Sequence, residues 1–129
     1  MENELRIAIL SWLRSESALA ALNLIDEEAP LASTPPWLGI AASASTDWGT
    51  KDRTGREVRL AFELETRIDD PQGDVGIVEL IEQRILSFPS AQAGFEVASI
   101  YFLRARTERR AANLRGTLLE YRFRVLRDS

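Results

Sequence analysis

The sequence contains no cysteine and no histidine. A chain without cysteine cannot form a disulfide, a thiolate zinc site or a cysteine nucleophile. A chain without histidine lacks the usual general base near neutral pH and the commonest metal ligand of proteins. Hydrolysis by a Ser-His-Asp or Cys-His unit is therefore excluded, and only carboxylate, arginine or lysine chemistry is left open.

Lysine and long apolar runs are also scarce. Lys51 is the only lysine, so arginine supplies nearly all of the basic charge. No apolar run approaches the roughly 20 residues that span a bilayer, and the opening "MENELR" lacks the basic and apolar regions of a signal peptide. We therefore expect a protein that is made in the cytoplasm and has no membrane partner.

The residues that are present have the balance of an ordinary globular domain. The chain has 129 residues, of which 45% are hydrophobic and 28% are charged, and single domains cluster around roughly 100 to 150 residues. We expect residues 1–129 to fold as one domain. The net charge is −4, but it is uneven, because residues 1–50 are rich in acidic groups and residues 91–129 in basic groups. The asymmetry predicts opposite-signed ends that bind another copy or a complementary partner.

Apolar residues recur at helical spacing in two segments. The first helix is expected from about Glu4 to Arg14. The second is expected to begin after an N-cap at Asp74 and to continue to Leu86, because Pro89 cannot extend it.

Alternation of apolar and polar residues, which is typical of a half-buried strand, is clearest in residues 56–66. Residues 35–45 read as a strand with small side chains. Residues 95–106 and 115–127 read as the two arms of a long C-terminal β-hairpin, with a turn at 107–114. The element order predicts an α+β fold, with an antiparallel or mixed β-sheet and two helices packed on one face.

The outgoing arm of the hairpin is apolar on both of its alternating sides. Two helices in so short a chain can cover one face of the sheet, so we expect Ile100 and Phe102 to lie uncovered on the other face. An uncovered apolar patch with a charged rim is typical of a subunit interface. The alternative is that long arginine stems shield Phe102 within the monomer.

The loop between residues 45 and 57 is longer than the two to five residues of an economical hairpin connection. It holds Trp48, a residue type that is enriched at binding hot spots. Its candidate contact residues are Asp47, Trp48, Lys51, Arg53 and Arg56. The alternative is that Trp48 folds back over the sheet edge as a lid.

Arginines crowd the expected tip of the last hairpin, namely Arg104, Arg106, Arg109, Arg110 and Arg115. We interpret them first as a protein contact surface, second as a solvated tip and third as a DNA-binding ribbon, since a basic β-ribbon can contact phosphates. The acidic net charge and the lack of aromatic residues at the tip argue against DNA.

No cofactor or metal site is expected. The acidic stretches "IDEEA" and "RIDDPQGD" carry oxygen ligands but do not match a calcium loop, so we interpret them as solvated loops. Gly49 and Gly55 match neither the sequence motif of a phosphate-binding loop nor that of a dinucleotide-binding site.

Three segments carry a common pattern: the helix "LRIAILSWL", the core "APLASTPPWLGIAASASTDWGTKDRTGREVRLAFELETR", and "VGIVELIEQRIL" with the terminal hairpin. Together they resemble a family of small tail-completion proteins, in particular the tail terminators of long-tailed phages, prophages and gene transfer agents. The resemblance covers about residues 5–125.

The resemblance implies an α+β structural protein of the virion that is not an enzyme. Its working form would be a hexameric ring that closes the head-proximal end of the tail tube. Its partners would be further copies of itself, the tail tube protein and the head connector or stopper protein, with DNA only as passing cargo. The alternatives are another neck or head-completion component and, less favoured, a DNA-binding module that uses the arginine-rich hairpin.

Overall fold

The computed structural model describes residues 1–28, 34–69 and 71–128, except for the side chains of 71–74. Its elements are two helices, one short 3-10 turn and six strands. In chain order they are α1 (Glu2–Arg14), η1 (Ser17–Leu19), β1 (Leu24–Ile25), β2 (Trp37–Asp47), β3 (Gly55–Arg67), α2 (Pro71–Leu86), β4 (Ala91–Gln92), β5 (Phe95–Arg110) and β6 (Leu114–Arg127).

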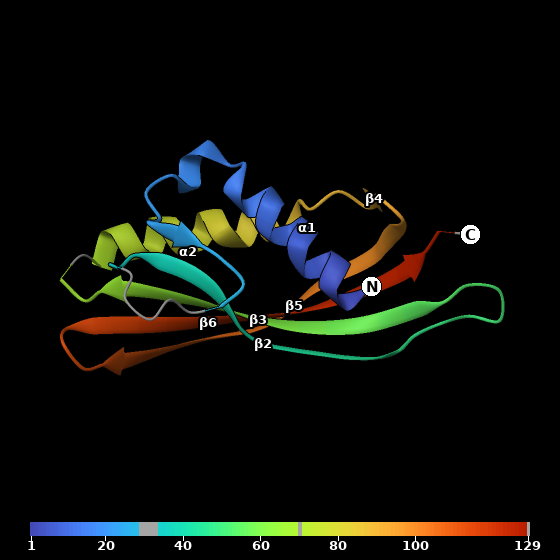
Figure 1. Ribbon diagram of the computed structural model, residues 1–129. Coiled ribbons are helices and arrows are strands. Elements are labelled where there is room, and N and C mark those ends of the chain that lie inside the picture. Colours follow the sequence, from blue (N-terminus) through green and yellow to red (C-terminus); the bar gives the residue numbers. More distant parts are fainter. Residues whose placement is uncertain (29–33, 70, 129) are drawn as a thin grey trace.

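The six strands form one mixed sheet in the order β1-β2-β3-β6-β5-β4. Among the described strands, only the pair β1–β2 is parallel, and the other four neighbouring pairs are antiparallel. Both helices cover the same face of the sheet, and the opposite face is left without a covering layer (Figure 1). The predicted α+β fold, with two helices on one face and a long C-terminal hairpin, is confirmed.

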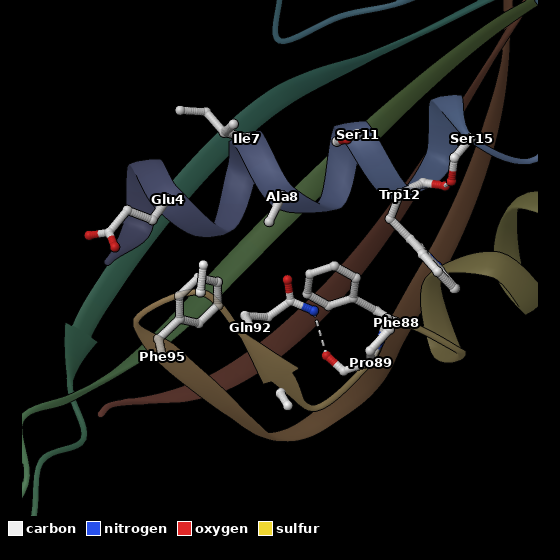
Figure 2. Close-up of a pocket in the computed structure, with 12 residues that line it drawn as sticks. Glu4, Ile7, Ala8, Ser11, Trp12, Ser15, Phe88, Pro89, Gln92 and Phe95 are labelled. Atoms are coloured by element: carbon white, nitrogen blue, oxygen red, sulfur yellow. Dashed lines mark hydrogen bonds between the residues drawn. The ribbon is translucent and has the colours of Figure 1, made fainter. Parts of the chain in front are cut away.

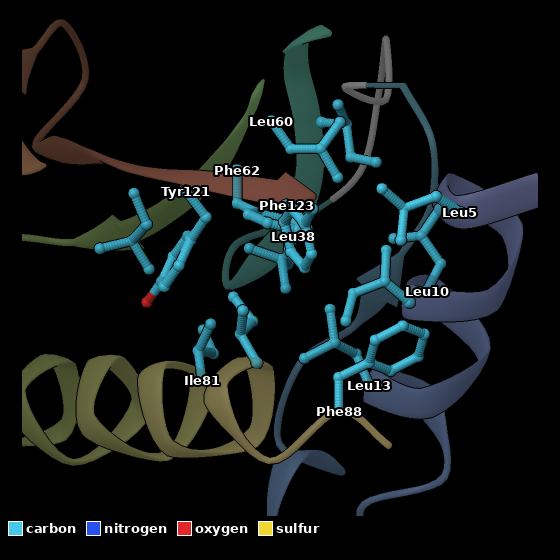
Figure 3. Close-up of a cluster of buried hydrophobic side chains, with 14 of the residues drawn as sticks. Leu5, Leu10, Leu13, Leu38, Leu60, Phe62, Ile81, Phe88, Tyr121 and Phe123 are labelled. Atoms are coloured by element: carbon cyan, nitrogen blue, oxygen red, sulfur yellow. The ribbon is translucent and has the colours of Figure 1, made fainter. Parts of the chain in front are cut away.

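The core lies between the helices and the covered face of the sheet (Figure 3). The alternating residues of β3 and β6 point into it, as their sequence pattern predicts, and side chains such as Phe62 and Phe123 are fully buried there. From the helices, Leu5 and Leu13 of α1 and Ile81 of α2 complete the cluster. Each such side chain contributes about 1.5 to 3 kcal/mol by leaving water.

The second helix begins earlier than the sequence pattern predicts. It starts at Pro71, so Asp74 lies within the first turn and is not the N-cap residue. Proline is favoured at the first position of a helix because its missing N–H has no partner there in any case. Pro71 therefore marks the start of the helix, which the spacing of apolar residues alone does not reveal.

The terminal hairpin is longer, and its turn tighter, than expected. The strands continue to Arg110 and resume at Leu114, so the turn comprises only residues 111–113 and not 107–114. Ala112 and Asn113 have φ values of 61° and 66°, in the left-handed region that tight hairpin turns use. The outer part of β5, residues 104–110, is mostly polar and exposed, so it lacks the usual alternation.

Two β-bulges in β5 change which face its side chains occupy. The register with β6 shifts between Val97 and Ser99 and again between Phe102 and Arg104. Because each bulge adds one residue, Ile100 and Phe102 lie on the helix-covered side, opposite Phe123 and Tyr121. The prediction that these two residues lie on the uncovered face is therefore wrong.

Candidate functional site

The uncovered face of the sheet carries several of the predicted contact residues. We call it the bare face, and it presents the outward-pointing side chains of β2, β3, β6 and β5. Its charged members are Glu57, Arg59, Glu63, Glu65, Arg104, Arg106, Glu108, Arg110, Glu120, Arg122 and Arg124. Most of them are joined in ion pairs that cross from strand to strand.

Arg110 makes the longest of these crossings. Its side chain starts on β5, passes over β6 at Gly116 and pairs with Glu63 at 2.6 Å and Glu65 at 2.9 Å on β3. A Cβ atom at position 116 would collide with the guanidinium, so glycine makes the crossing possible. Burial lowers the pKa of Arg110, but hydrogen bonds and charge attraction from Glu65 and Glu63 outweigh it and raise the pKa above its ordinary value.

A second pair lies nearer the centre of the face. Arg104 of β5 donates to the carboxylate of Glu120 on β6, its direct cross-strand neighbour. This hydrogen bond is the main reason that the pKa of Glu120 is lowered and that of Arg104 is raised. The two side chains border a hollow of about 400 Å³ whose lining also includes Ala44 and Ala61.

Trp48 belongs to a row of alternating rings and charges across the bare face. The Arg124 guanidinium lies 5.4 Å from the centre of the Trp48 ring, and Arg124 pairs with Glu57 at 3.1 Å. Glu57 also lies 3.8 Å from Arg122, whose guanidinium lies 4.8 Å from the Tyr101 ring. Cation–π contacts of this kind contribute about 0.5 to 1 kcal/mol at exposed sites. The half-buried tryptophan is thus held by the bare face and not by the core.

The loop that begins at Trp48 is shorter than the sequence predicts, and its side chains contact other strands of the sheet. Because β2 continues to Asp47 and β3 begins at Gly55, the loop spans residues 48–54. Arg53 pairs with Glu96 of β5 at 3.0 Å and donates to the Arg127 carbonyl at 3.1 Å.

The remaining predicted contact residues, Asp47, Lys51 and Arg56, lie in the loop at residues 48–54 or in the strand ends beside it. Arg56 donates to the Ser45 hydroxyl at 3.2 Å, and Asp47 accepts a long hydrogen bond of 3.4 Å from the Gly49 amide. The Lys51 side chain is exposed at the end of the loop. Trp48, Arg53 and Arg56 are therefore brought close to the sheet, whereas Lys51 points to solvent.

The tip of the terminal hairpin lies at the other end of the sheet, so the structure separates the two groups of predicted contact residues. Arg106 and Arg109 are exposed there, and no ion pair is recorded for either within the described ranges. Arg104 and Arg110 already bind carboxylates. The sequence did not single out Gly116 or the glutamates that pair with Arg104 and Arg110. A glycine inside a strand can indicate that another group approaches the backbone closely, as the Arg110 side chain does at Gly116.

An apolar groove lies on the helix side of the molecule, between α1 and the segment around β4 (Figure 2). Its volume is about 640 Å³, and its lining includes Ala8, Trp12, Phe88 and Phe95. At its rim Ile7 exposes 64% of its surface. The sequence reading did not single out this groove, because its two walls are about 80 residues apart in the chain.

The described residues hold no group of three or more side chains that could bind a metal ion. Asp70 and the side chain of Asp74, from one of the acidic stretches, lie outside them. Within the same ranges, no helix is long and apolar enough to cross a membrane.

Comparison with known proteins identifies a family and solved structures that share the fold. The family model for tail completion protein gp17 matches residues 7–126. Among solved structures, a chain from the virion of a native gene transfer agent particle shares the fold with a TM-score of 0.82, over 96% of both chains and at 18% identity. No curated protein matches the chain. Because the family model spans nearly the whole sequence, the chain belongs to the tail completion protein gp17 family, a family of structural proteins that are not enzymes.

Proposed function

We propose that the protein is a tail terminator, a subunit of a six-membered ring that caps the head-proximal end of a tail tube and joins it to the head connector. One observation carries the proposal: the loop at residues 48–54 and the turn at residues 111–113 lie at opposite ends of one sheet (Figure 1). A ring subunit whose strands follow the ring axis presents one of these ends to the tube and the other to the connector.

Each end of the sheet has charged side chains suited to a protein partner. The loop end contributes Asp47, Trp48, Lys51, Arg53 and Arg56, and the hairpin end contributes the exposed Arg106 and Arg109. Charges at the edge of a contact set its specificity and its rate of formation more than its affinity. The two ends therefore suit two different partners.

The pairing of arginines on the bare face favours this role over DNA binding. Arg104 and Arg110 are neutralised by Glu120 and by Glu63 with Glu65, so they are not free to bind phosphates. In the proposed ring, DNA passes through without being held. We expect no salt-sensitive binding to duplex DNA, whose affinity would otherwise fall steeply with salt concentration.

The fold match with a chain of a gene transfer agent virion supports a place in a tailed particle. The deciding experiment is electron microscopy of particles from cells that lack the gene, with complementation as the control. We expect heads without attached tails and tails of irregular, excessive length. Tails of normal, fixed length would contradict the proposal.

The partner at each end can be identified with matched charge reversals. We expect Arg106→Glu with Arg109→Glu to weaken capture of one partner, either tube protein or connector, and Lys51→Glu to weaken capture of the other. If both variants lose only the connector, the protein is instead a head-side neck component.

A further inference from the structure

Two stretches of the sheet edge have unpaired backbone groups. On one side, β1 covers β2 only at Trp37 and Leu38, and on the other β4 covers β5 only at Phe95 and Glu96. The Ile40 amide then donates to the Glu27 carbonyl, and the Val97 amide donates to the Ser90 carbonyl. The Ser90 hydroxyl also donates to the Val97 carbonyl. Beyond these, in the part of the chain that the structure describes, the β2 edge (residues 41–47) and the β5 edge (residues 98–110) pair with no further strand. A free edge is a template for another strand.

The β5 edge is also apolar where it is free. Tyr101, Phe102 and Leu103 expose 60%, 43% and 38% of their surfaces. Soluble monomers usually protect such an edge with charged side chains, proline, bulges or a covering segment. Residues 99–102, which lie between the two bulges of β5, contain no charged residue and no proline. Its hydrogen-bonding groups and its apolar side chains together favour addition of a strand from another chain.

The β2 edge of a second copy has the complementary shape. Residues 41–46 have only alanine, serine and threonine side chains, so large side chains from β5 have room beside them. The two edges are also level with each other in the sheet, because Ala44 pairs with Arg59, which pairs with Arg122, which pairs with Tyr101. When the β2 edge of one copy lies beside the β5 edge of the next, the small residues around Ala44 are therefore level with the apolar residues around Tyr101 along the strand direction.

Strand direction fits the same arrangement. The strands β2, β3, β6 and β5 alternate in direction, so the two outer ones run opposite to each other. Rotation about a ring axis parallel to the strands preserves their direction in every subunit. The β5 edge of one copy thus meets the β2 edge of the next in antiparallel orientation, which continues the existing pattern.

We propose that the subunits of the ring are joined by antiparallel pairing of the β5 edge of one copy with the β2 edge of the next, which makes one continuous sheet. This inference rests on the proposed ring. The competing contact, β5 with β5, closes as a dimer and cannot build a ring.

Cysteine cross-linking tests the contact without background, because the natural chain has no cysteine. The principal variant combines Ala44→Cys with Tyr101→Cys, and the controls are the two single variants. Two further pairs, Ala44→Cys with Ser99→Cys and Thr46→Cys with Tyr101→Cys, allow for a two-residue shift in register. Oxidation is carried out on the protein in solution and in assembled particles, followed by non-reducing electrophoresis.

We expect a ladder of oligomers up to the closed ring from one of the double variants and only monomers from each single variant. Dimers from Tyr101→Cys alone would show β5–β5 pairing and overturn the proposal. Rings that are seen by light scattering or microscopy but yield no ladder from any pair would also overturn it, while leaving the terminator function intact. Failure of the protein to enter particles at all would instead contradict the terminator function.

A substitution at the edge gives an independent check. Leu103→Lys places a positive charge at the free edge, so we expect a folded monomer whose assembly is at least tenfold weaker. Val75→Lys on α2 is the matched control, because Val75 exposes 59% of its surface away from the edge. Equal assembly by the two variants would contradict the proposal.

Discussion

The environment of Trp48 differs from that of Trp12, which shows how position decides the role of the same residue type. Trp12 donates to the Arg84 carbonyl at 2.7 Å, and the Arg84 guanidinium lies 3.3 Å from its ring, so it joins α1 to α2. Trp48 is half-buried and contacts Arg124 on the bare face, at the end of the sheet that projects beyond the helices.

We predict that Trp48→Ala weakens assembly more than it lowers the free energy of unfolding. The substitution removes a partly exposed ring, so the stability loss should be about 1 to 2 kcal/mol, whereas loss of a tryptophan at a contact commonly costs 2 kcal/mol or more in binding. Chemical denaturation and assembly on tail tubes provide the two measurements. Trp12→Ala is the control and should mainly lower stability. A sharp fall in stability with unchanged assembly would support the lid interpretation instead.

A second prediction concerns the crossing of Arg110 over Gly116. We expect Gly116→Ala to displace the guanidinium from Glu63 and Glu65 at a cost of about 1 kcal/mol, because a flexible side chain can move away without disturbing the backbone. Denaturant unfolding in a double-mutant cycle with Arg110→Ala checks the cause. The two losses should not add, and full additivity would show that the glycine acts through something else.

At the scale of the elements, the tight turn of the terminal hairpin lacks the glycine that its geometry favours. Ala112 and Asn113 both have positive φ values. Asparagine tolerates this region, but alanine is strained there by about 1 to 2 kcal/mol, because its Cβ lies close to the neighbouring carbonyl.

We predict that Ala112→Gly raises the free energy of unfolding by about 0.5 to 1 kcal/mol, since relief of the strain exceeds the entropy that glycine adds to the unfolded chain. Denaturant unfolding measures the change. Ala111→Gly is the matched control, because Ala111 has no positive φ and glycine there should slightly lower stability. A loss of stability from both substitutions would contradict the prediction.

At the scale of the whole molecule, the two oppositely charged parts of the chain become two layers. The acidic residues of the first part lie in and around the helices, where Glu2 and Glu27 pair with Arg6. The arginines of the last part lie mainly on the sheet and pair with glutamates of β3 and β6. The net negative charge is therefore concentrated on the helix side, and the bare face is close to neutral.

The pH dependence of stability follows from the shifted groups. Hydrogen bonds from Ser43 and from Arg104 are the largest causes that lower the pKa values of Glu2 and Glu120, respectively. A carboxyl whose pKa is lower in the folded state contributes stability that is present above its unfolded value and is lost as pH falls through the folded value. Burial raises the pKa of Tyr121 above 10.0, so its contribution is lost as pH rises beyond that value.

Because the chain has no histidine, we predict a flat stability plateau from about pH 5 to about pH 10, with losses on both sides. Urea unfolding at a series of pH values measures it. The variant Glu120→Gln should shift the acid limb only slightly, since this carboxylate is close to the surface. A step between pH 6 and pH 8 would contradict the prediction.

Local sequence patterns determined much of this protein. Alternation of apolar and polar residues identified β3 and β6, and helical spacing of apolar residues identified α1 and α2, because side-chain periodicity is a local property of each element. The absence of cysteine and histidine excluded thiolate and imidazole catalysis, and the diffuse pattern along the chain identified the family.

Only the tertiary structure decided where the contact residues lie. The β5 bulges moved Ile100 and Phe102 to the helix side, because register depends on pairing with β6 and not on β5 alone. Two partners of Arg110, Glu63 and Glu65, are more than 40 residues away in sequence, and Gly116 matters because that side chain passes over it. The face on which a strand residue lies, the path of the Arg110 side chain and the unpaired sheet edges all depend on long-range strand pairing. The sequence of a single strand does not encode that pairing.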